Sequence, residues 1–449
     1  MRVLIIGSGN AGQNLAAKLC EEKHDVVLVD HRQEPLTEVQ SHLDIMTVRG
    51  SGSSPTVLEK AEIRKAELLV AVTDRDEVNI LACVMAQAAG VPHKVARVSN
   101  LDLLRPPEGY DLHKLGIDLV VSQKEECAYE LFNVLRMPGT LEAVDLLEGR
   151  VLAAGIRVHM DSPLIREPLK AFPRPELLQT IRFIAGKRGD ELLIPRGDSQ
   201  FMVGDEIYFV GPPDDINVFL EWAWPEHASF QKVVIAGGGD VGVRLAQLLE
   251  KTPMQIVLIE PDEERAEYCS GVLGRALVIR GDPMNDETQA EAGLGQNSAF
   301  VAATADDENN IIGCLLAAKL GARFTLAQVN KPEYVPIIDS LSLLDHVVSP
   351  PLSMINAILH FVRGKNVKAA ALFHKLPGEL LDVVLPPRGK WGGKAVKDIP
   401  LPEGVTIAAG LRGEKVLSAT GDLVLAAGDR LVLFSPPSVV TKLAALFRK

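Results

Sequence analysis

The sequence predicts an α/β protein with two doubly wound parallel-sheet domains, each followed by a small α+β domain. Two observations predict it. The stretch VLIIGSGNAGQNLA (3–16) recurs as VVIAGGGDVGVRLA (233–246), and in each copy an apolar run leads through a G-x-G-x-x-G turn into a helical pattern. After that turn the two halves of the chain align at a nearly constant offset (242 − 12 = 230; 280 − 49 = 231). Internal repetition over this length indicates that one architecture is built twice.

The glycine turns are the first candidate sites. The first glycine permits a tight strand-to-helix connection, the second lets the backbone approach a pyrophosphate, and the third lets the helix pack close to the strand. The anionic pyrophosphate would lie at the helix N-terminus, where free N–H groups favour negative charge. We therefore expect the first turn and, less strongly, the second to bind a dinucleotide. The candidate residues are Gly7, Ser8, Gly9, Asn10, Ala11 and Gly12, and then Gly237, Gly239, Asp240 and Gly242. The alternative is a pair of glycine-rich turns in a fold that holds no ligand.

An acidic residue ends the strand that follows each turn. Asp30 closes VVLVD and Glu260 closes IVLIE, both 18 residues beyond the third glycine (30 − 12 = 18; 260 − 242 = 18). Such a carboxylate accepts hydrogen bonds from the adenosine ribose hydroxyls and repels a 2′-phosphate. The spacing therefore favours NAD over NADP.

The first 122 residues alternate between strands and helices. We expect strands at 2–6, 26–30, 45–48, 67–72, 94–98 and 117–121, and helices at 10–22, 35–42, 53–60 and 76–89. In a parallel sheet of this kind, ligands bind outside the carboxyl ends of the strands. Three further strand ends should therefore meet the glycine turn. Gly50 and Ser51 could line the adenosine, Thr73 and Asp74 could border the far side of the ligand, and Arg97 could supply the positive charge for phosphate. An exposed arginine at a strand end is the alternative for Arg97.

The second half carries a more acidic version of this site. Gln328 replaces Arg97 (328 − 97 = 231), Asp282 replaces Ser51, and Thr304 keeps the position of Thr73 (304 − 73 = 231). Because the second site has lost a cation and gained an acid, it is the weaker phosphate site. We expect the first site to be occupied before the second.

A long helix follows each parallel-sheet domain. The first domain (1–122) leads into a helix at 123–138, and the second domain (231–349) leads into a helix at 350–365. Each helix has more apolar surface than a single buried face needs. It could therefore pack on a neighbouring subunit or within its own chain.

The small domains are expected at 139–222 and 366–449. The first reads as a hairpin with a turn at Glu148-Gly149, a short helix at 162–171 and three further strands, and residues 222–231 read as a linker. Arg182, Lys187 and Arg188 of this domain could bind a small anion, although a solvated basic edge is the stronger interpretation.

Composition excludes several classes of protein. The formal net charge of −12 argues against nucleic acid as a partner and against adsorption to anionic lipid. No apolar run is long enough to cross a membrane, and the strand at the N-terminus leaves no room for a signal peptide, so we expect a cytoplasmic protein without direct membrane insertion. The five cysteines include no CxxC pair and the ten histidines never occur at metal-ligand spacing, so we expect neither structural disulfides nor a metal site.

The residues offer no reaction centre. There is no Walker lysine, no nucleophile elbow, no HExxH, and no set of convergent polar residues in the small domains that could act as a proton relay. A non-enzymatic sensor is therefore the preferred interpretation. An NAD-dependent oxidoreductase is the main alternative, and a redox-sensing transcription factor is a third, although the acidic chain shows no basic helix-turn-helix.

Two Rossmann-like domains with a glycine turn and a strand-two acid, each followed by a helix and a small α+β domain ending in G-D-x-Φ-x-x-x-x-P-P, resemble the regulator-of-K⁺-conductance (RCK) family. The resemblance covers essentially the whole chain. It implies NAD(H) in the N-terminal domain, ATP or ADP as competing regulators, and assembly into a homotetrameric ring of eight modules. It also implies docking beneath a membrane-embedded K⁺-translocating subunit. The family's ligand residues carry over to Gly7, Gly9, Gly12, Asp30, Thr73 and Arg97, and less securely to Gly237, Gly239, Gly242 and Glu260.

Overall fold

The structure, a computed structural model, divides into two compact units. One unit comprises Met1–Phe132 and Phe230–Leu359, and the other comprises Asn133–Ser229 and His360–Lys449. Each unit thus combines one segment from each half of the repeat. The described residues are 1–107, 109–138, 140–189, 191–223, 230–295, 297–341, 343–363, 369–372, 378–386, 391–436, 439 and 443. Most of the expected linker, 224–229, lies outside them, as do the last residues expected for the second long helix, 364–365.

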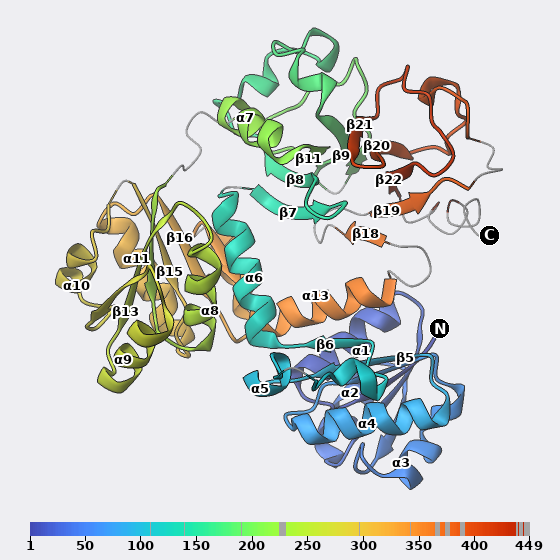
Figure 1. The fold of residues 1–449 in the computed structure, drawn as a ribbon, viewed down its shortest axis with the longest axis vertical. Helices are drawn as coiled ribbons and strands as arrows, with labels where there is room; N and C mark the ends of the chain where they lie inside the picture. Colours follow the sequence, from blue (N-terminus) through green and yellow to red (C-terminus); the bar gives the residue numbers. More distant parts are fainter. Residues whose placement is uncertain are drawn as a thin grey trace. The chain divides into compact units, whose positions relative to one another are not determined.

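The first half of the chain forms a six-stranded parallel sheet (Figure 1). Its strands are β1 (Arg2–Ile6), β2 (Asp25–Asp30), β3 (Met46–Arg49), β4 (Leu68–Ala71), β5 (His93–Arg97) and β6 (Leu119–Val121). The helices between them are α1 (Asn10–Glu21), α2 (Gln33–His42), α3 (Pro55–Lys60), α4 (Asp76–Ala89) and α5 (Leu101–Leu104). The strand order β3-β2-β1-β4-β5-β6 reverses between β1 and β4. In open α/β sheets a ligand cleft forms at this point of reversal.

The central strands are buried on both faces. Leu4 and Ile6 of β1 belong to the same core as Ala82 and Ala86 of α4. Val3 and Ile5 are also fully buried, so helices cover the opposite face of the strand as well. A parallel sheet enclosed in this way requires nearly continuous apolar strands, which is what the sequence supplies.

The second half repeats the sheet with the order β14-β13-β12-β15-β16-β17. Its strands are β12 (Lys232–Ala236), β13 (Gln255–Glu260), β14 (Leu277–Arg280), β15 (Ser298–Ala302), β16 (Phe324–Gln328) and β17 (His346–Val348). Its helices are α8 (Asp240–Leu249), α9 (Glu263–Val272), α10 (Asp286–Glu291), α11 (Asp307–Lys319) and α12 (Tyr334–Leu341). The fold class expected from the sequence is therefore confirmed for both halves.

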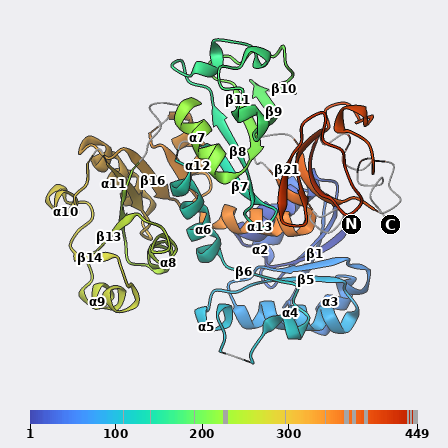
Figure 2. The same cartoon turned by 45° about the horizontal axis from the view of Figure 1, so that its top comes forward.

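Two long helices connect the halves within the first unit. Helix α6 (Gln123–Arg136) follows the first sheet, yet its side chains contact α8 of the second module, because Glu125 accepts from Arg244 Nε at 2.9 Å. Helix α13 (Pro350–Arg363) follows the second sheet, and its Pro351 lines a cavity of the first module. The two helices meet where Ser353 donates a hydrogen bond to Glu130 (Figures 1 and 2). Of the two packings left open by the sequence, the chain contains the internal one.

The second unit contains two five-stranded antiparallel sheets with matching orders, β10-β9-β11-β8-β7 and β21-β20-β22-β19-β18. The strands of the first are β7 (Thr140–Leu146), β8 (Val151–Arg157), β9 (Arg182–Arg188), β10 (Glu191–Leu193) and β11 (Glu206–Gly211). Those of the second are β18 (Ala369–Leu372), β19 (Glu379–Val384), β20 (Thr406–Arg412), β21 (Lys415–Ser418) and β22 (Arg430–Ser435). One apolar core joins them, since Tyr208 and Val210 pack in the same cluster as Val432 and Phe434.

One local expectation for this unit is wrong. Instead of a helix over 162–171, the chain forms two short 3-10 turns, Pro163–Ile165 and Leu169–Ala171. Pro168 separates them, and a proline lacks the N–H that a continuous helix would need. Helix α7 (Pro213–Ala223) was not expected from the sequence; its apolar residues Ile216, Phe219, Leu220 and Ala223 pack into the core of the sheet. Among the described residues, no helix combines the length and apolar character needed to cross a membrane.

Candidate functional site

A cavity of about 600 Å³ opens at the carboxyl edge of the first parallel sheet, where the strand order reverses. Ten of the residues singled out in the first half line it: Gly7, Gly9, Asn10, Ala11, Asp30, Gly50, Ser51, Thr73, Asp74 and Arg97. Ser8 and Gly12, also singled out, belong to the same turn but are not among the residues that line the cavity. Residues far apart in the sequence therefore meet around one space.

The glycine turn has the geometry expected from its spacing. Gly7 has a φ of +107°, which residues with a side chain rarely adopt. A Cβ on Gly12 would stand 1.8 Å from the carbonyl oxygen of Gly7, so only glycine lets α1 approach the strand this closely. A Cβ on Gly9 would meet nothing within 4 Å and would project into open space. The turn thus leaves room beside its backbone at the second glycine.

Asp30 is a buried carboxylate that holds the turn in place. Its Oδ2 accepts from the backbone N–H of Ser8 at 2.7 Å, and its Oδ1 accepts from the N–H of Arg32 at 2.8 Å. Burial alone would raise the pKa of Asp30, but the hydrogen bonds donated by Arg32 and Ser8 outweigh burial and hold it below its ordinary value. A carboxylate has about four acceptor positions, so Asp30 keeps capacity for further donors.

Arg97 carries a positive charge for which the described residues provide no ion-pair partner within 4 Å. The residue is partly buried, and its Nε is enclosed without a hydrogen-bond partner among the described residues. Burial lowers the pKa of Arg97, while the negative charges of Asp76 and Asp74 oppose that shift. An arginine that lines a cavity is suited to binding an anion there.

A buried amide joins two of these strand ends. Asn79 of α4 accepts hydrogen bonds from the backbone N–H of Thr73 at 2.9 Å and from its hydroxyl at 2.7 Å. The same side chain donates to the backbone carbonyl of Arg97 at 2.9 Å. Asn79 therefore fixes the β4 and β5 ends relative to each other. The sequence carried a signal for it, because Asn79 recurs as Asn310 in the second half (310 − 79 = 231).

Further lining residues were not identified from the sequence: Ile6, Val29, His31, Arg32, Gly52, Val72, Arg75, Val78, Gln123 and Pro351. Arg32 follows the strand-two acid closely and could have been noticed. Gln123 begins α6 and Pro351 comes from α13, more than 200 residues away in sequence (351 − 123 = 228). Gln123 comes to the cavity from the nearby end of β6, whereas Pro351 reaches it because α13 packs against the first module.

The second module repeats the backbone of the site. Gly237 has a φ of +108°, and a Cβ on Gly242 would stand 2.0 Å from the carbonyl oxygen of Gly237. Glu260 accepts from the N–H of Gly238 at 2.6 Å, as Asp30 does from Ser8. Thr304 donates to Asn310 at 2.6 Å, as Thr73 does to Asn79.

The side chains of the second cleft differ from those of the first. Asp240, which occupies the position of Asn10, is engaged by Lys124 Nζ at 2.6 Å and by an Nη of Arg265 at 3.1 Å. These interactions, led by the hydrogen bond from Lys124, lower the pKa of Asp240. Asp282 accepts from the backbone N–H of Met284, and Gln328 stands where Arg97 stands in the first module. In the second cleft, the positive charges of Lys124 and Arg265 are therefore paired with the carboxylate of Asp240.

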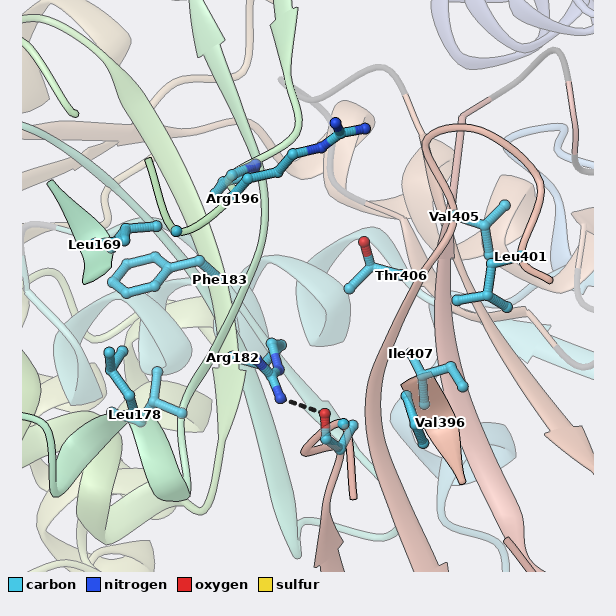
Figure 3. A pocket seen from close by; sticks show the side chains of 15 residues that line it. Leu169, Leu178, Arg182, Phe183, Arg196, Val396, Leu401, Val405, Thr406 and Ile407 are labelled. Carbon is cyan, nitrogen blue, oxygen red and sulfur yellow. Dashed lines mark hydrogen bonds between the residues drawn. The ribbon is translucent and has the colours of Figure 1, made fainter. Parts of the chain in front are cut away.

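Another cavity, of about 390 Å³, lies between the two antiparallel sheets of the second unit (Figure 3). Arg182 lines it and donates a hydrogen bond to the carbonyl oxygen of Ala419 across the cavity, as Figure 3 shows. Arg188 forms an ion pair with the buried Asp205, at 2.7 Å. Of the basic residues expected at this edge, Arg182 thus contacts the second small domain, and Arg188 forms an ion pair within its own domain.

The described part of the chain contains no group of three or more His, Cys, Asp or Glu side chains that could hold a metal ion. All five cysteines are free thiols, and four of them are buried. Burial raises the pKa of Cys83 and of Cys314 to about 12, which keeps both thiols protonated and unreactive.

Comparison with known families matches all four segments of the chain. The TrkA-N domain family matches residues 3–123 and 233–350, and the TrkA-C domain family matches 153–223 and 380–448.

Two relatives show the extent of the similarity. The Trk system potassium uptake protein TrkA of Azorhizobium caulinodans is 32% identical over 455 residues, covering 100% of this chain and 99% of the relative. The protein of the same name from Halomonas elongata is 32% identical over 438 residues, covering 97% of this chain and 95% of the relative.

Among solved structures, the RCK domain of GsuK superposes with a TM-score of 0.61 at 20% identity, covering 99% of this chain and 94% of that one. The GsuK channel bound to NAD superposes with a TM-score of 0.61 at 20% identity, covering 99% of this chain and 79% of that one. These likenesses establish a common fold.

Proposed function

The chain belongs to the family of Trk system potassium uptake proteins with tandem TrkA-N and TrkA-C domains, and on that premise we propose that it is the nucleotide-binding regulatory subunit of a potassium uptake system. The proposed ligand of the first cleft is NAD(H), with ATP or ADP as competing adenine nucleotides. The proposed partner is a membrane-embedded Trk-type transporter subunit, to which the protein attaches peripherally on the cytoplasmic side.

The observation that carries the nucleotide assignment is the juxtaposition of Arg97 with the glycine turn. The cavity is lined by Arg97, has open space at Gly9 and lies at the N-terminus of α1. Each of these favours a phosphate group. In the proposed complex the turn and Arg97 hold the pyrophosphate, and Asp30 orients the ribose by accepting from its hydroxyls.

The remaining strand ends complete the proposed site. Gly50 and Ser51 would line the adenosine, while Thr73 and Asp74 would bound the other end of the ligand. Asn79 acts as a positioning residue, because its hydrogen bonds fix the backbone at Thr73 and at Arg97. We propose that the corresponding residues of the second module form a docking site for α6. They are Gly237, Gly239, Asp240, Gly242, Glu260, Asp282 and Thr304.

We assign no chemical step to the cleft. The relatives are named as uptake proteins, and the charged groups at the cavity have roles in positioning and in charge complementarity. A regulator acts by binding its nucleotide more tightly in one conformation than in another, and a coupling of about 1–3 kcal/mol is typical. An NAD-dependent oxidoreductase would instead consume NADH, so a steady absorbance at 340 nm with candidate substrates distinguishes the two.

We further propose a homotetramer in which eight TrkA-N modules form a ring. Matched apolar side chains on α4 and α11 support it, since Leu81 is 39% exposed and Ile312, its counterpart (312 − 81 = 231), is 51% exposed. Two equivalent apolar faces on one chain suit a closed assembly that uses the same contact repeatedly.

Titration calorimetry with NADH tests the nucleotide assignment. Arg97→Ala removes a charged donor to phosphate and should weaken binding about 10- to 100-fold. Arg64→Ala is the matched control, because Arg64 belongs to the same module but pairs with Glu59 at the surface, and binding should not change. Equal affinities of the two variants would refute the role of Arg97.

A further inference from the structure

The two long helices exchange places between the TrkA-N modules, but their first turns differ in charge. Ser122 precedes α6 as Ser349 precedes α13, so Lys124 matches Pro351 (349 − 122 = 227; 351 − 124 = 227). Pro351 reaches the rim of the first cavity. Lys124 reaches the glycine turn of the second module, 2.6 Å from Asp240. The helix start at the first cleft thus contributes the uncharged side chain of Pro351. The helix start at the second contributes the ammonium group of Lys124.

Asp240 is the first residue of α8, where a nucleotide phosphate would approach a dinucleotide fold. Its carboxylate, neutralised by Lys124 and by Arg265, already supplies negative charge at that helix N-terminus. Arg265 also donates through Nε to the carbonyl oxygen of Gly238 at 2.6 Å. A phosphate would have to displace Asp240 from both cations, and it would find Gln328 in place of the arginine of the first site.

A second ion pair lies beside the first and is more deeply buried. Arg244 of α8 donates to Glu125 at 2.9 Å and to the hydroxyl of Tyr129 at 2.8 Å. The side chains of Arg244 and Glu125 are only 17% and 15% exposed. Glu125 also pairs with Arg105 of the first module at 2.5 Å, so its carboxylate joins the two modules. We call Lys124, Glu125, Asp240 and Arg244 together the α6–α8 clasp.

We propose that the second TrkA-N cleft is an internal docking site for α6, and that the α6–α8 clasp transmits occupancy of the first cleft to the second module. The proposal rests on the proposed function, because it requires a nucleotide in the first cleft. The connection is short: Gln123 lines the first cavity, and Lys124 and Glu125 follow it directly in the same helix. A ligand that shifts Gln123 shifts the start of α6, and α8 follows through two ion pairs.

The difference in charge between the two clefts indicates different roles for the two TrkA-N modules. The first module has an open cavity with an unneutralised arginine, and the second has a self-neutralised turn held by the neighbouring helix. The chain should therefore bind one NADH. A response of α8 to NADH should then arise indirectly, through α6.

Hydrogen–deuterium exchange on the full chain, with and without NADH, tests the proposal. One peptide covering 7–12 reports the first cleft, and one covering 239–249 reports α8. In the parent protein NADH should change exchange in both, with an effect on α8 of about fivefold or more. In Lys124→Met and in Asp240→Asn the 7–12 peptide should still respond, while the response of 239–249 should be lost. Lys18→Met, which removes the ammonium of the exposed Lys18–Glu21 pair, is the matched control and should behave like the parent.

Arg97→Ala separates the two routes to α8. At an NADH concentration near the dissociation constant of the parent, where this variant is mostly unoccupied, a signal that passes through the clasp should be lost at both peptides. A response of 239–249 that persists in Arg97→Ala while the 7–12 peptide no longer responds would mean that NADH binds the second cleft directly, which overturns the docking role. An undiminished response of 239–249 in both Lys124→Met and Asp240→Asn would overturn transmission through the clasp. No response at 7–12 in the parent would instead overturn the proposed function, and this inference with it.

Discussion

Gly9 and Gly12 stand three residues apart in one turn, yet their surroundings differ. At Gly12 the carbonyl oxygen of Gly7 fills the place of a side chain, whereas at Gly9 that place is open. Glycine is therefore required at position 12 for folding. At position 9 its absent side chain leaves the space that a ligand would need.

Gly12→Ala should therefore destabilise the first module, because its Cβ would overlap the Gly7 carbonyl and force α1 away from β1. A cost of about 1–3 kcal/mol is expected from overpacking of this kind. Thermal unfolding measures it as a lowered melting temperature. An unchanged melting temperature would show that α1 can move without cost.

Gly9→Ala should leave the melting temperature near that of the parent, since its Cβ meets nothing within 4 Å. It should nevertheless weaken NADH binding, because the methyl group enters the space assigned to the pyrophosphate. Calorimetric titration of the same preparation measures the affinity. Full affinity would remove the pyrophosphate from this turn.

Glu126 on α6 makes a pH-dependent contribution to stability. Burial, followed by the like charges of Glu125 and Glu130, raises its pKa to about 7. An unfolded glutamate titrates near pH 4.3, so between about pH 4 and 7 the folded chain binds more protons and loses stability as the pH rises. Glu126→Gln should thus melt a few degrees, about 2–4 °C, above the parent at pH 8 and close to it at pH 4. A difference that did not vary with pH would contradict this assignment.

At the scale of secondary structure, the sequence was most informative where hydrophobic periodicity and glycine spacing agreed. Strands of the parallel sheet such as β1, β2 and β4 are continuous apolar runs, and their ends carry the polar residues that meet at the cavity. The region 162–171 was harder, because Pro168 interrupts a helical pattern and leaves two 3-10 turns. Helix α7 was missed where Pro212-Pro213 resembled the end of a strand rather than the start of a helix.

The site shows the same division. Residues at the ends of strands could be predicted, because topology alone brings strand ends together. Gln123 also follows a strand end, that of β6, and could have been included. Pro351 could not, since its place depends on which module α13 packs against.

In each antiparallel sheet, a buried aspartate just before a strand forms an ion pair with an arginine and accepts a hydrogen bond from a backbone N–H of the preceding turn. Asp429 accepts from Arg412 through both oxygens at 2.7 Å and from the N–H of Ala426 at 2.7 Å, and Asp205 repeats the arrangement with Arg188. The hydrogen bonds from Arg412, foremost among the causes, hold the pKa of Asp429 below its ordinary value.

Asp429→Asn should lower stability by about 1–3 kcal/mol at pH 7 through the loss of charge-assisted bonds. The contribution of a carboxylate with a lowered pKa is present above its unfolded value, about 3.9, and is lost as the pH falls through the folded pKa. The gap between variant and parent should therefore narrow toward pH 3, as followed by thermal unfolding. Asp422→Asn is the control, because the Lys397–Asp422 pair is exposed and should contribute little. Equal losses in the two variants would contradict the distinction.

At the scale of the whole molecule, the two halves of the chain have the same fold. The first cleft contains an open cavity. The second half has the same backbone geometry at its turn, but there the carboxylate of Asp240 forms ion pairs with Lys124 and Arg265. In the proposed function, the first module receives the nucleotide and the second module responds to it.

The proposed ring makes a prediction about mass. Ile312→Glu places a charge on the exposed apolar face of α11 and should reduce the assembly from four chains to smaller species. Met160→Glu, at a side chain 72% exposed in the other unit, should leave the assembly intact. Light scattering after size-exclusion chromatography measures both masses. A parent protein with the mass of one chain would remove the ring.

The most direct test is calorimetric titration of the purified full-length protein with NADH, repeated for Arg97→Ala. Binding of one NADH per chain, weakened about 10- to 100-fold in the variant, is the expected result. Failure of the parent to bind any adenine nucleotide, or turnover of NADH during the titration, would contradict a regulator that senses nucleotide through its first cleft.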